Sequence, residues 1–152
     1  MVSKDAYDAA KSMAGMLGTL VKVTIQEVDK EKTLELLGKV GESLGAVYAD
    51  LFKEPDLNKV ATKIEEMNAS SGFSSKVEVK ANKIFNNVYR CPVYDGILGV
   101  GFDHEAIKAI CQSLVKGENT GLRRVNPKAT TTLRKFRKSA DDFCQEVFEI
   151  KK

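Results

Sequence analysis

The sequence predicts an α+β fold in which an N-terminal helical half packs on an antiparallel sheet made of two hairpins, with one helix inserted between them. Before residue 72, apolar residues recur every three or four positions, which is the period of an amphipathic helix. From residue 73 the period changes to two, which is typical of strands. A length of 152 residues fits one domain, 1–152, with a helical half (1–72) and a half of sheet plus helix (73–152).

Two long helices are expected first. Ser3 suits the N-cap of a helix that continues towards Val28, and Asp29 suits the cap of the next. Their apolar stripes comprise Ala6, Ala10, Met13, Ala14, Leu17 and Val21 in the first helix, and Leu34, Leu37, Val40, Leu44, Val47, Tyr48 and Leu51 in the second. The second stripe also carries Gly38, Gly41 and Gly45. These glycines either permit close helix contact, within the chain or across a dimer, or only loosen the helix.

A third, shorter helix follows a proline. Pro55 ends the second helix, because its ring removes a donor and restricts the residue before it. Asp56 is then placed to cap a helix bearing Val60, Ile64 and Met67. The turn-forming run at residues 68–72 is expected to end it.

The second half of the chain predicts the sheet. Residues 76–80 and 84–91 alternate around a turn at Asn82 and Lys83, and Pro92 ends the second strand with Cys91 at the rim of the sheet. Residues 93–101 predict a short helical turn and a connection. Asp103 then caps a helix over residues 104–116, while Gly117 and Gly121 are expected to bracket an exposed loop. Residues 130–137 and 143–150 predict the second hairpin.

Composition excludes several classes of protein. Apolar residues make up 43% of the chain and charged residues 30%, as in ordinary globular proteins. No apolar run approaches the ~20 residues needed to cross a bilayer, and the N-terminus does not resemble a secretory signal. Three cysteines, an odd number, argue against a disulfide framework. We therefore expect a cytoplasmic protein with reduced thiols and no membrane partner.

The basic residues are unevenly placed, although the net charge is only +3. Residues 116–138 hold eight Lys or Arg against one acid, Glu118. This segment is either a solvated surface or a region of positive potential that attracts a small anion. Nucleic acid is not expected as a partner, because only Phe136 and Phe143 accompany the basic residues and no known nucleic-acid-binding module is present.

The three cysteines are the main candidates for chemistry. Cys91 ends a strand, Cys111 lies on a helix and Cys144 begins the last strand. If these elements pack together, the sulfurs converge on one site. Three interpretations remain open: a nucleophilic thiol, a metal site, or inert buried cysteines that pack as small apolar residues. Separations of 20 and 33 residues give none of the close pairs that mark strong metal sites.

Several short motifs of the second half resemble one family. They are VYRCPVY at 88–94, Ile110-Cys111, VNPK at 125–128, TTL at 131–133, and ADDFC at 140–144 with Phe148. In residues and spacing they resemble the L-2-amino-thiazoline-4-carboxylic acid hydrolase family, over residues 88–152. That family is similar in turn to the 4-vinyl reductase domains, small α+β ligand-binding folds that commonly dimerise through their helices.

The resemblance implies hydrolysis of a small, cyclic, carboxylated amino-acid derivative, with no cofactor required. Cys91 or Cys111 would be the reactive thiol and Tyr94 would orient the substrate. His104, the only histidine, is a further catalytic candidate. The family commonly has an acid a few positions after the central cysteine, whereas here no acid follows Cys111 until Glu118.

The ligand-binding candidates are Arg124 or Arg134 for the carboxylate, with Asn126 and Cys144 beside them. The alternative function is a non-catalytic sensor or carrier of a small ligand, or of a metal. In that case Cys91, Cys111 and Cys144, with an external fourth ligand, would bind zinc or an iron-sulfur cluster. The expected partners are a small anionic molecule and a second copy of the chain, bound through the N-terminal helices.

Overall fold

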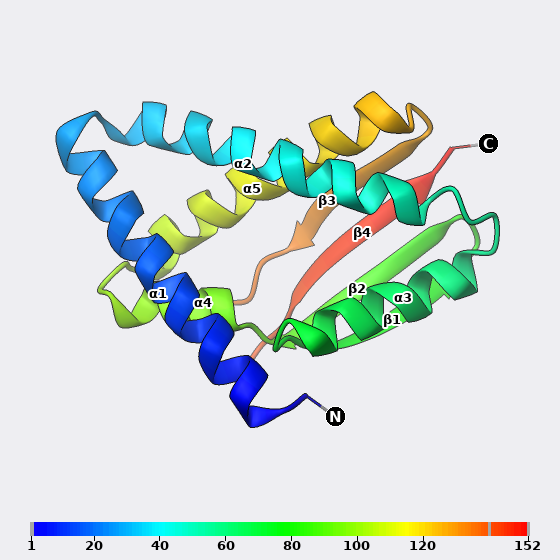
Figure 1. The fold of residues 1–152 in the computed structure, drawn as a ribbon, viewed down its shortest axis with the longest axis horizontal. Coiled ribbons are helices and arrows are strands. Elements are labelled where there is room, and N and C mark those ends of the chain that lie inside the picture. The colour runs from blue at the N-terminus through cyan, green and yellow to red at the C-terminus, as the bar shows by residue number, and fades with distance from the viewer. Residues whose placement is uncertain (1, 140, 152) are drawn as a thin grey trace.

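The computed structural model describes residues 2–139 and 141–151, and it confirms the α+β class (Figure 1). The N-terminal helices precede the first hairpin, as expected. The elements in chain order are α1 (Lys4–Glu27), α2 (Lys30–Leu51), α3 (Leu57–Ser70), β1 (Ser74–Lys80), β2 (Lys83–Arg90), α4 (Pro92–Gly99), α5 (His104–Val125), β3 (Ala129–Lys135) and β4 (Cys144–Ile150).

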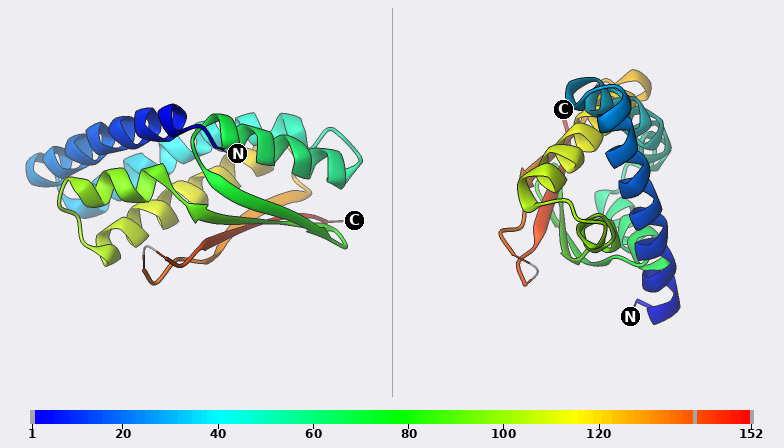
Figure 2. Two further views of the ribbon diagram at one scale, coloured as in Figure 1. Left: turned by 90° about the horizontal axis from the view of Figure 1, so that it is seen from below. Right: turned by 90° about the vertical axis from the view of Figure 1, so that its left-hand side faces the viewer.

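The two hairpins form one antiparallel sheet with strand order β1-β2-β4-β3. The second strand of each hairpin lies at the centre, where β2 pairs with β4 so that Val88 faces Cys144 and Asn86 faces Glu146. The helices gather on one side of the sheet and leave its other side uncovered (Figure 2). The side chains on the covered side of β2 and β4 therefore meet the helices.

Local capping explains where the helices begin. The side chains of Ser3, Asp29, Asp56 and Asp103 each accept a hydrogen bond from a backbone N–H in the first turn, at 3.0, 2.6, 2.9 and 2.8 Å. Each of these contacts satisfies a donor that has no partner within its helix. The expected helix starts are confirmed at all four positions.

The expected end of the fifth helix is wrong. Instead of stopping near residue 116, α5 continues to Val125, and Gly117 and Gly121 are buried within it. A Cβ atom at Gly117 would lie 1.9 Å from the carbonyl oxygen of Gly38 on α2, and one at Gly121 would lie 1.9 Å from that of Glu42. Glycine weakens an isolated helix by about 1 kcal/mol, but here it permits direct backbone contact between two helices.

The same contact decides between the two interpretations of the glycines in α2. A Cβ atom at Gly41 would lie 2.1 Å from the carbonyl oxygen of Leu114, and one at Gly45 would lie 2.0 Å from that of Glu118. These glycines therefore permit close helix contact within the chain. The α2–α5 pair that results brings the middle of α5 over the sheet.

Two clusters of buried side chains form the core. One lies between α2, α3 and the sheet and includes Ile64 and Phe148. The other joins α1, α4 and α5 and includes Ile97 and Ile107. The short helical turn predicted within residues 93–101 is α4, so α4 and α5 together separate the two hairpins. In the described residues, no helix is both long and apolar enough to cross a membrane.

Candidate functional site

The three thiols line a single cavity. Cys91, Cys111 and Cys144 belong to the walls of a space of about 160 Å³ between α5 and the covered side of the sheet. The other lining residues are apolar except for two carboxyl groups: Phe73, Val88, Val93, Leu114, Val115, Glu118, Leu133, Phe136 and Glu146. The three cysteines therefore lie around one cavity, as the hypothesis from the sequence required.

Each cysteine reaches the cavity by a different route. Cys144 faces Val88 across the β2–β4 pair. Cys91 follows β2 directly and is the N-cap of α4, where its Sγ accepts a hydrogen bond from the amide of Tyr94 at 3.4 Å. Cys111 is on α5, which the glycine contact fixes against α2.

The thiols of Cys91 and Cys111 are neutral at physiological pH. Burial raises the pKa of Cys91 to about 11, and burial raises the pKa of Cys111 still further. The positive charge of Arg137 acts against burial at both residues, but it is the weaker influence. Since the thiolate is the nucleophile, neither thiol is activated in the resting protein.

Two carboxyl groups lie on the same cavity wall. Glu118 of α5 and Glu146 of β4 are hydrogen-bonded to each other, and Thr131 Oγ1 donates to Glu146 Oε1 at 2.8 Å. Burial raises the pKa of both groups, and the charge of Glu146 raises that of Glu118 further. Two carboxyl groups so close cannot both ionise readily, so the pair retains a proton at neutral pH.

A chain of buried polar side chains supports this pair. Asn86 hydrogen-bonds to Glu146, and its Oδ1 accepts from Asn68 Nδ2 at 3.0 Å. Asn68 Nδ2 also donates to Ser75 Oγ at 2.9 Å. Asn68 is 8% exposed and Asn86 is 4% exposed, so both depend on these partners. The network fixes the position of Glu146 from the β1 side of the sheet.

A buried cation lies beside the cysteine side of the cavity. Arg137 is only 1% exposed, and its Nη2 donates to the carbonyl oxygens of Tyr89 and Asp142 at 2.6 and 2.9 Å. Its guanidinium carbon lies 4.9 Å from the centroid of the Tyr94 ring. Within the described part of the chain, its Nε has no hydrogen-bond partner and no carboxylate forms an ion pair with it. A buried guanidinium without an anion is unusual.

The catalytic candidates Tyr94 and His104 lie next to each other but do not line the cavity. The Tyr94 hydroxyl and His104 Nδ1 are 3.2 Å apart. The Tyr94 ring is 5% exposed and packs among the side chains around Ile97. Tyr94 is therefore linked to the site through its amide contact with Cys91 and through its ring contact with Arg137.

Three ligand-binding candidates lie away from the cavity. Arg124 is near the end of α5, where its Nη1 contacts Glu42 at 2.6 Å, because the helix is longer than expected. Arg134 is on the uncovered side of the sheet, 6.0 Å from the Phe85 ring. Asn126 follows α5, and its side chain accepts a hydrogen bond from the amide of Lys128. Of the four ligand-binding candidates, only Cys144 lines the cavity.

The sequence analysis missed the carboxyl pair, although the sequence contained a signal for each member. Glu118 lies seven residues after Cys111, two helical turns along on the same side, provided that the helix continues past Gly117. Glu146 lies two residues after Cys144, on the same side of the strand as Phe148. An acid on the apolar side of a strand is the stronger of these two signals.

No three His, Cys, Asp or Glu side chains in residues 2–139 and 141–151 are arranged to hold a metal ion. The three cysteines share a cavity without forming a ligand set. Comparison of the chain with models of protein families gives no match, and comparison with curated proteins gives none.

Proposed function

We propose that the cavity binds a small cyclic amino-acid derivative and that the protein hydrolyses a C–N bond of its cyclic amidine. One observation carries this proposal: three thiols and a pair of carboxyl groups, contributed by α5, β4 and the junction between β2 and α4, line a single cavity of about 160 Å³. An apolar cavity of about 150 Å³ accepts a benzene ring, so the space fits one small ring. The resemblance of residues 88–152 to the thiazoline hydrolase family supplies the reaction class.

Cys91 is the better candidate for the reactive thiol. Its pKa of about 11 is lower than that of Cys111, and its Sγ already accepts an amide hydrogen bond that favours the thiolate. To attack a substrate, the thiol must first transfer its proton to a base. The carboxylate of Glu146 lines the same cavity and is suited to that role. No cofactor is needed for this chemistry.

The second candidate function is a non-catalytic carrier or sensor of a small ligand. The neutral state of Cys91 and Cys111 favours it, since neither thiol is activated before a ligand arrives. Under this alternative the three cysteines would bind zinc or an iron-sulfur cluster only if their side chains were rearranged. Metal analysis of protein purified without an affinity tag tests this alternative.

The hydrolase proposal is tested with 2-amino-thiazoline-4-carboxylate as substrate, and ring opening is followed by mass spectrometry. We expect turnover that Cys91→Ser abolishes and Cys144→Ser reduces. Glu105→Gln, at an exposed first-turn position of α5, is the control and should keep full activity. Absence of turnover, or full turnover by Cys91→Ser, would contradict the proposal.

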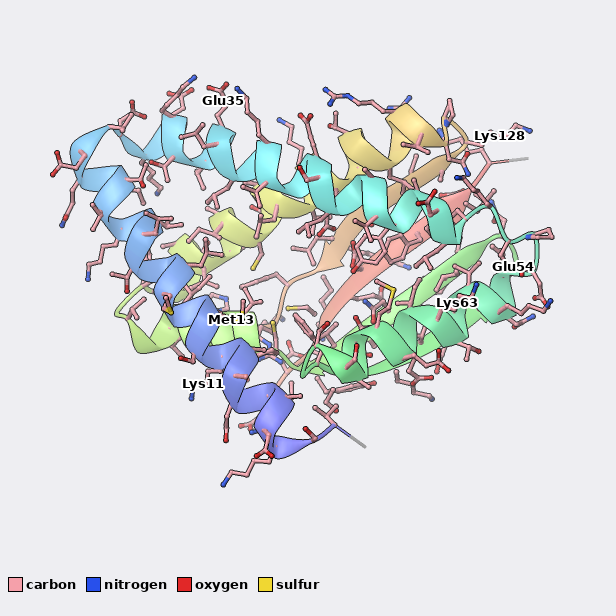
Figure 3. The ribbon with its side chains drawn as sticks, in the orientation of Figure 1. Lys11, Met13, Glu35, Glu54, Lys63 and Lys128 are labelled. Atoms are coloured by element: carbon pink, nitrogen blue, oxygen red, sulfur yellow. The ribbon has the colours of Figure 1, made fainter. Side chains whose placement is uncertain are left out.

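We also propose that the chain forms a homodimer through α1 and α2. Eight large apolar side chains on these two helices are at least 41% exposed: Met13, Met16, Leu20, Val23, Leu36, Val40, Leu44 and Val47. Met13 is labelled on α1 in Figure 3. An apolar surface on two adjacent helices is typical of a protein–protein interface.

We also propose that the protein is cytoplasmic, where its thiols stay reduced, as the sequence analysis expected.

Light scattering of Met16→Glu/Leu20→Glu tests the dimer. The wild-type chain should have twice the mass of the monomer, and the double variant should have the monomer mass. A monomeric wild-type chain would contradict the proposal. Lys4→Glu, at the beginning of α1, is a charge control that should leave the mass unchanged.

A further inference from the structure

The carboxyl pair has no function in a cavity that takes only an anion. The sequence analysis expected an anionic ligand held by Arg124 or Arg134, but neither residue lines the cavity. The ionisable groups that do line it are the cysteines and two acids, Glu118 and Glu146. This end of the cavity complements a positive charge.

Among the residues that the structure describes, no cation forms an ion pair with the carboxyl pair. Besides burial, the negative charge of the pair raises the pKa of Tyr48 on α2, and that of Glu118 raises the pKa of Cys111 on α5. Thr131, Asn86 and, through Asn86, Asn68 contribute neutral hydrogen bonds. No Lys, Arg or His in the described residues forms an ion pair with Glu118 or Glu146, since the ion pairs of β4 and α5 involve Glu149, Glu105 and Arg124. The proton shared by the two carboxyl groups therefore removes one of their two negative charges, and the other remains without a cationic partner among the described residues.

A second observation, independent of the carboxyl groups, also indicates a ligand. Arg137 is buried beside the cysteine side of the cavity, with its Nε unpartnered, and its charge acts on both Cys91 and Cys111. The cavity is thus polarised, with a fixed positive charge near the cysteines and two acids on the wall formed by α5 and β4. A polarised cavity of this kind complements a ligand with a protonated nitrogen at one end.

We infer that Glu118 and Glu146 recognise the protonated nitrogen of the ligand, as an amidinium or ammonium group, and that this cation replaces their shared proton. Two carboxylates can accept the parallel N–H donors of an amidinium group. When the cation binds, the O–H bond of the protonated carboxyl group of the pair breaks and its proton passes to the solvent, while the ligand keeps its own protons. This inference rests on the proposed function, because a cyclic amidine carries such a charge.

The exchange of the shared proton for a cation allows the cavity to select ligands by their charge. A neutral ligand of the same shape would have to leave the shared proton in place and could accept or donate only one neutral hydrogen bond. Hydrogen bonds to charged groups contribute more to binding than neutral ones do. The carboxyl pair therefore favours a cation over its neutral isostere, and it makes the binding of the cation tighter as pH rises.

Acetamidinium and acetamide are matched probes, because they differ in charge but hardly in size. Isothermal titration calorimetry in two buffers of different ionisation enthalpy measures both affinity and proton release. We expect the wild-type chain to bind acetamidinium about tenfold more tightly than acetamide, a factor within the difference between charged and neutral hydrogen bonds. We expect it to release a proton on binding acetamidinium and none on binding acetamide.

Three variants make the test specific. Glu118→Gln keeps the size and one hydrogen bond of the pair but has no shared proton, so it should bind acetamidinium without proton release. Glu118→Gln/Glu146→Gln should lose the preference for the cation. Glu149→Gln, on the same strand but paired with Lys83 on the uncovered side, should behave as the wild type. Circular dichroism establishes that each variant is folded.

The inference is overturned if acetamidinium fails to bind the wild-type chain, if acetamide binds equally well, or if the double variant retains the preference. Failure of the hydrolase proposal looks different. In that case acetamidinium binds with proton release, but no cyclic amidine is turned over. Conversely, turnover that survives in the double variant overturns the inference and the role of Glu146 as base, but it leaves hydrolysis by Cys91 standing.

Discussion

Glu118 on α5 and Glu146 on β4 are hydrogen-bonded to each other on one wall of the cavity that the three cysteines line. The two residues are brought together by the packing of a helix on a sheet, and the polar network through Asn86 and Asn68 holds Glu146 in place. Their contact therefore links the free energy of unfolding to the protonation of the two carboxyl groups.

The carboxyl pair predicts that stability falls as pH rises above the acidic range. The pKa of Glu118 is raised from 4.5 in the folded protein, so the folded state holds a proton that the unfolded state loses. Its stabilising contribution is complete below about pH 4.5 and is lost as pH rises through the folded pKa. Glu118→Gln should therefore show a smaller loss of unfolding free energy between about pH 5 and pH 8 than the wild type. Urea denaturation at several pH values measures this difference.

Acids whose pKa is lowered do not interfere with that measurement. Lys135 lowers the pKa of Asp142, and Lys83 lowers that of Glu149. The stability that Asp142 and Glu149 contribute is lost as pH falls below the ordinary pKa range of carboxyl groups, which is a different pH range. If the wild type and Glu118→Gln have parallel stability curves between about pH 5 and pH 8, the shared proton is contradicted.

The contact between α2 and α5 predicts a strong effect of a single methyl group. Gly41→Ala would place a Cβ atom 2.1 Å from the Leu114 carbonyl oxygen, so the two helices must separate. We expect a loss of about 1–3 kcal/mol or more in unfolding free energy, as in overpacked cores. Gly99→Ala is the matched control, since nothing lies within 4 Å of its added Cβ atom. Chemical denaturation of the two variants should therefore give different midpoints.

The burial of the thiols predicts slow alkylation. Because the pKa of Cys91 is about 11, iodoacetamide should react with it at neutral pH far more slowly than with the same cysteine in urea. The rate should rise steadily as pH approaches about 11. Peptide mass mapping after timed alkylation identifies which cysteine has reacted. A fast reaction of Cys91 at neutral pH would contradict the neutral state inferred for it.

The charge of Arg137 leads to a prediction for the pH dependence of Cys91 alkylation. Its charge lowers the pKa of Cys91, so Arg137→Met should move the alkylation profile of Cys91 to higher pH. Arg137→Met also leaves the carbonyl oxygens of Tyr89 and Asp142 without their donor, so we expect a loss of about 1–3 kcal/mol in unfolding free energy. Arg134→Met, on the uncovered side of the sheet, is the control for the loss of a nearby charge. An unchanged Cys91 profile in Arg137→Met would show that the guanidinium has no influence on the site.

The local features of this fold can be predicted from the sequence, because local chemistry determines them. Ser3, Asp29, Asp56 and Asp103 cap helices where Ser and Asp satisfy the first free amides. The two hairpins follow the period of two. The convergence of the cysteines remained conditional, since it depended on how three distant segments pack.

The features that could not be predicted depend on a neighbour. Gly117 looks like a helix breaker until Gly38 of α2 is placed against it. Because the helix was expected to stop near residue 116, the prediction placed Glu118 in a loop. It also placed Arg124 at the ligand site, whereas Arg124 contacts Glu42. An error in the length of one helix therefore caused the largest errors in the site.

The direct contact of the α2 and α5 backbones also affects how the cavity can move. At the glycines the backbones of the two helices touch directly, so a displacement of α2 is passed to α5, which carries both Cys111 and Glu118. Any molecule that settles on the outer surface of α2 would thus press on the wall of the cavity without touching it.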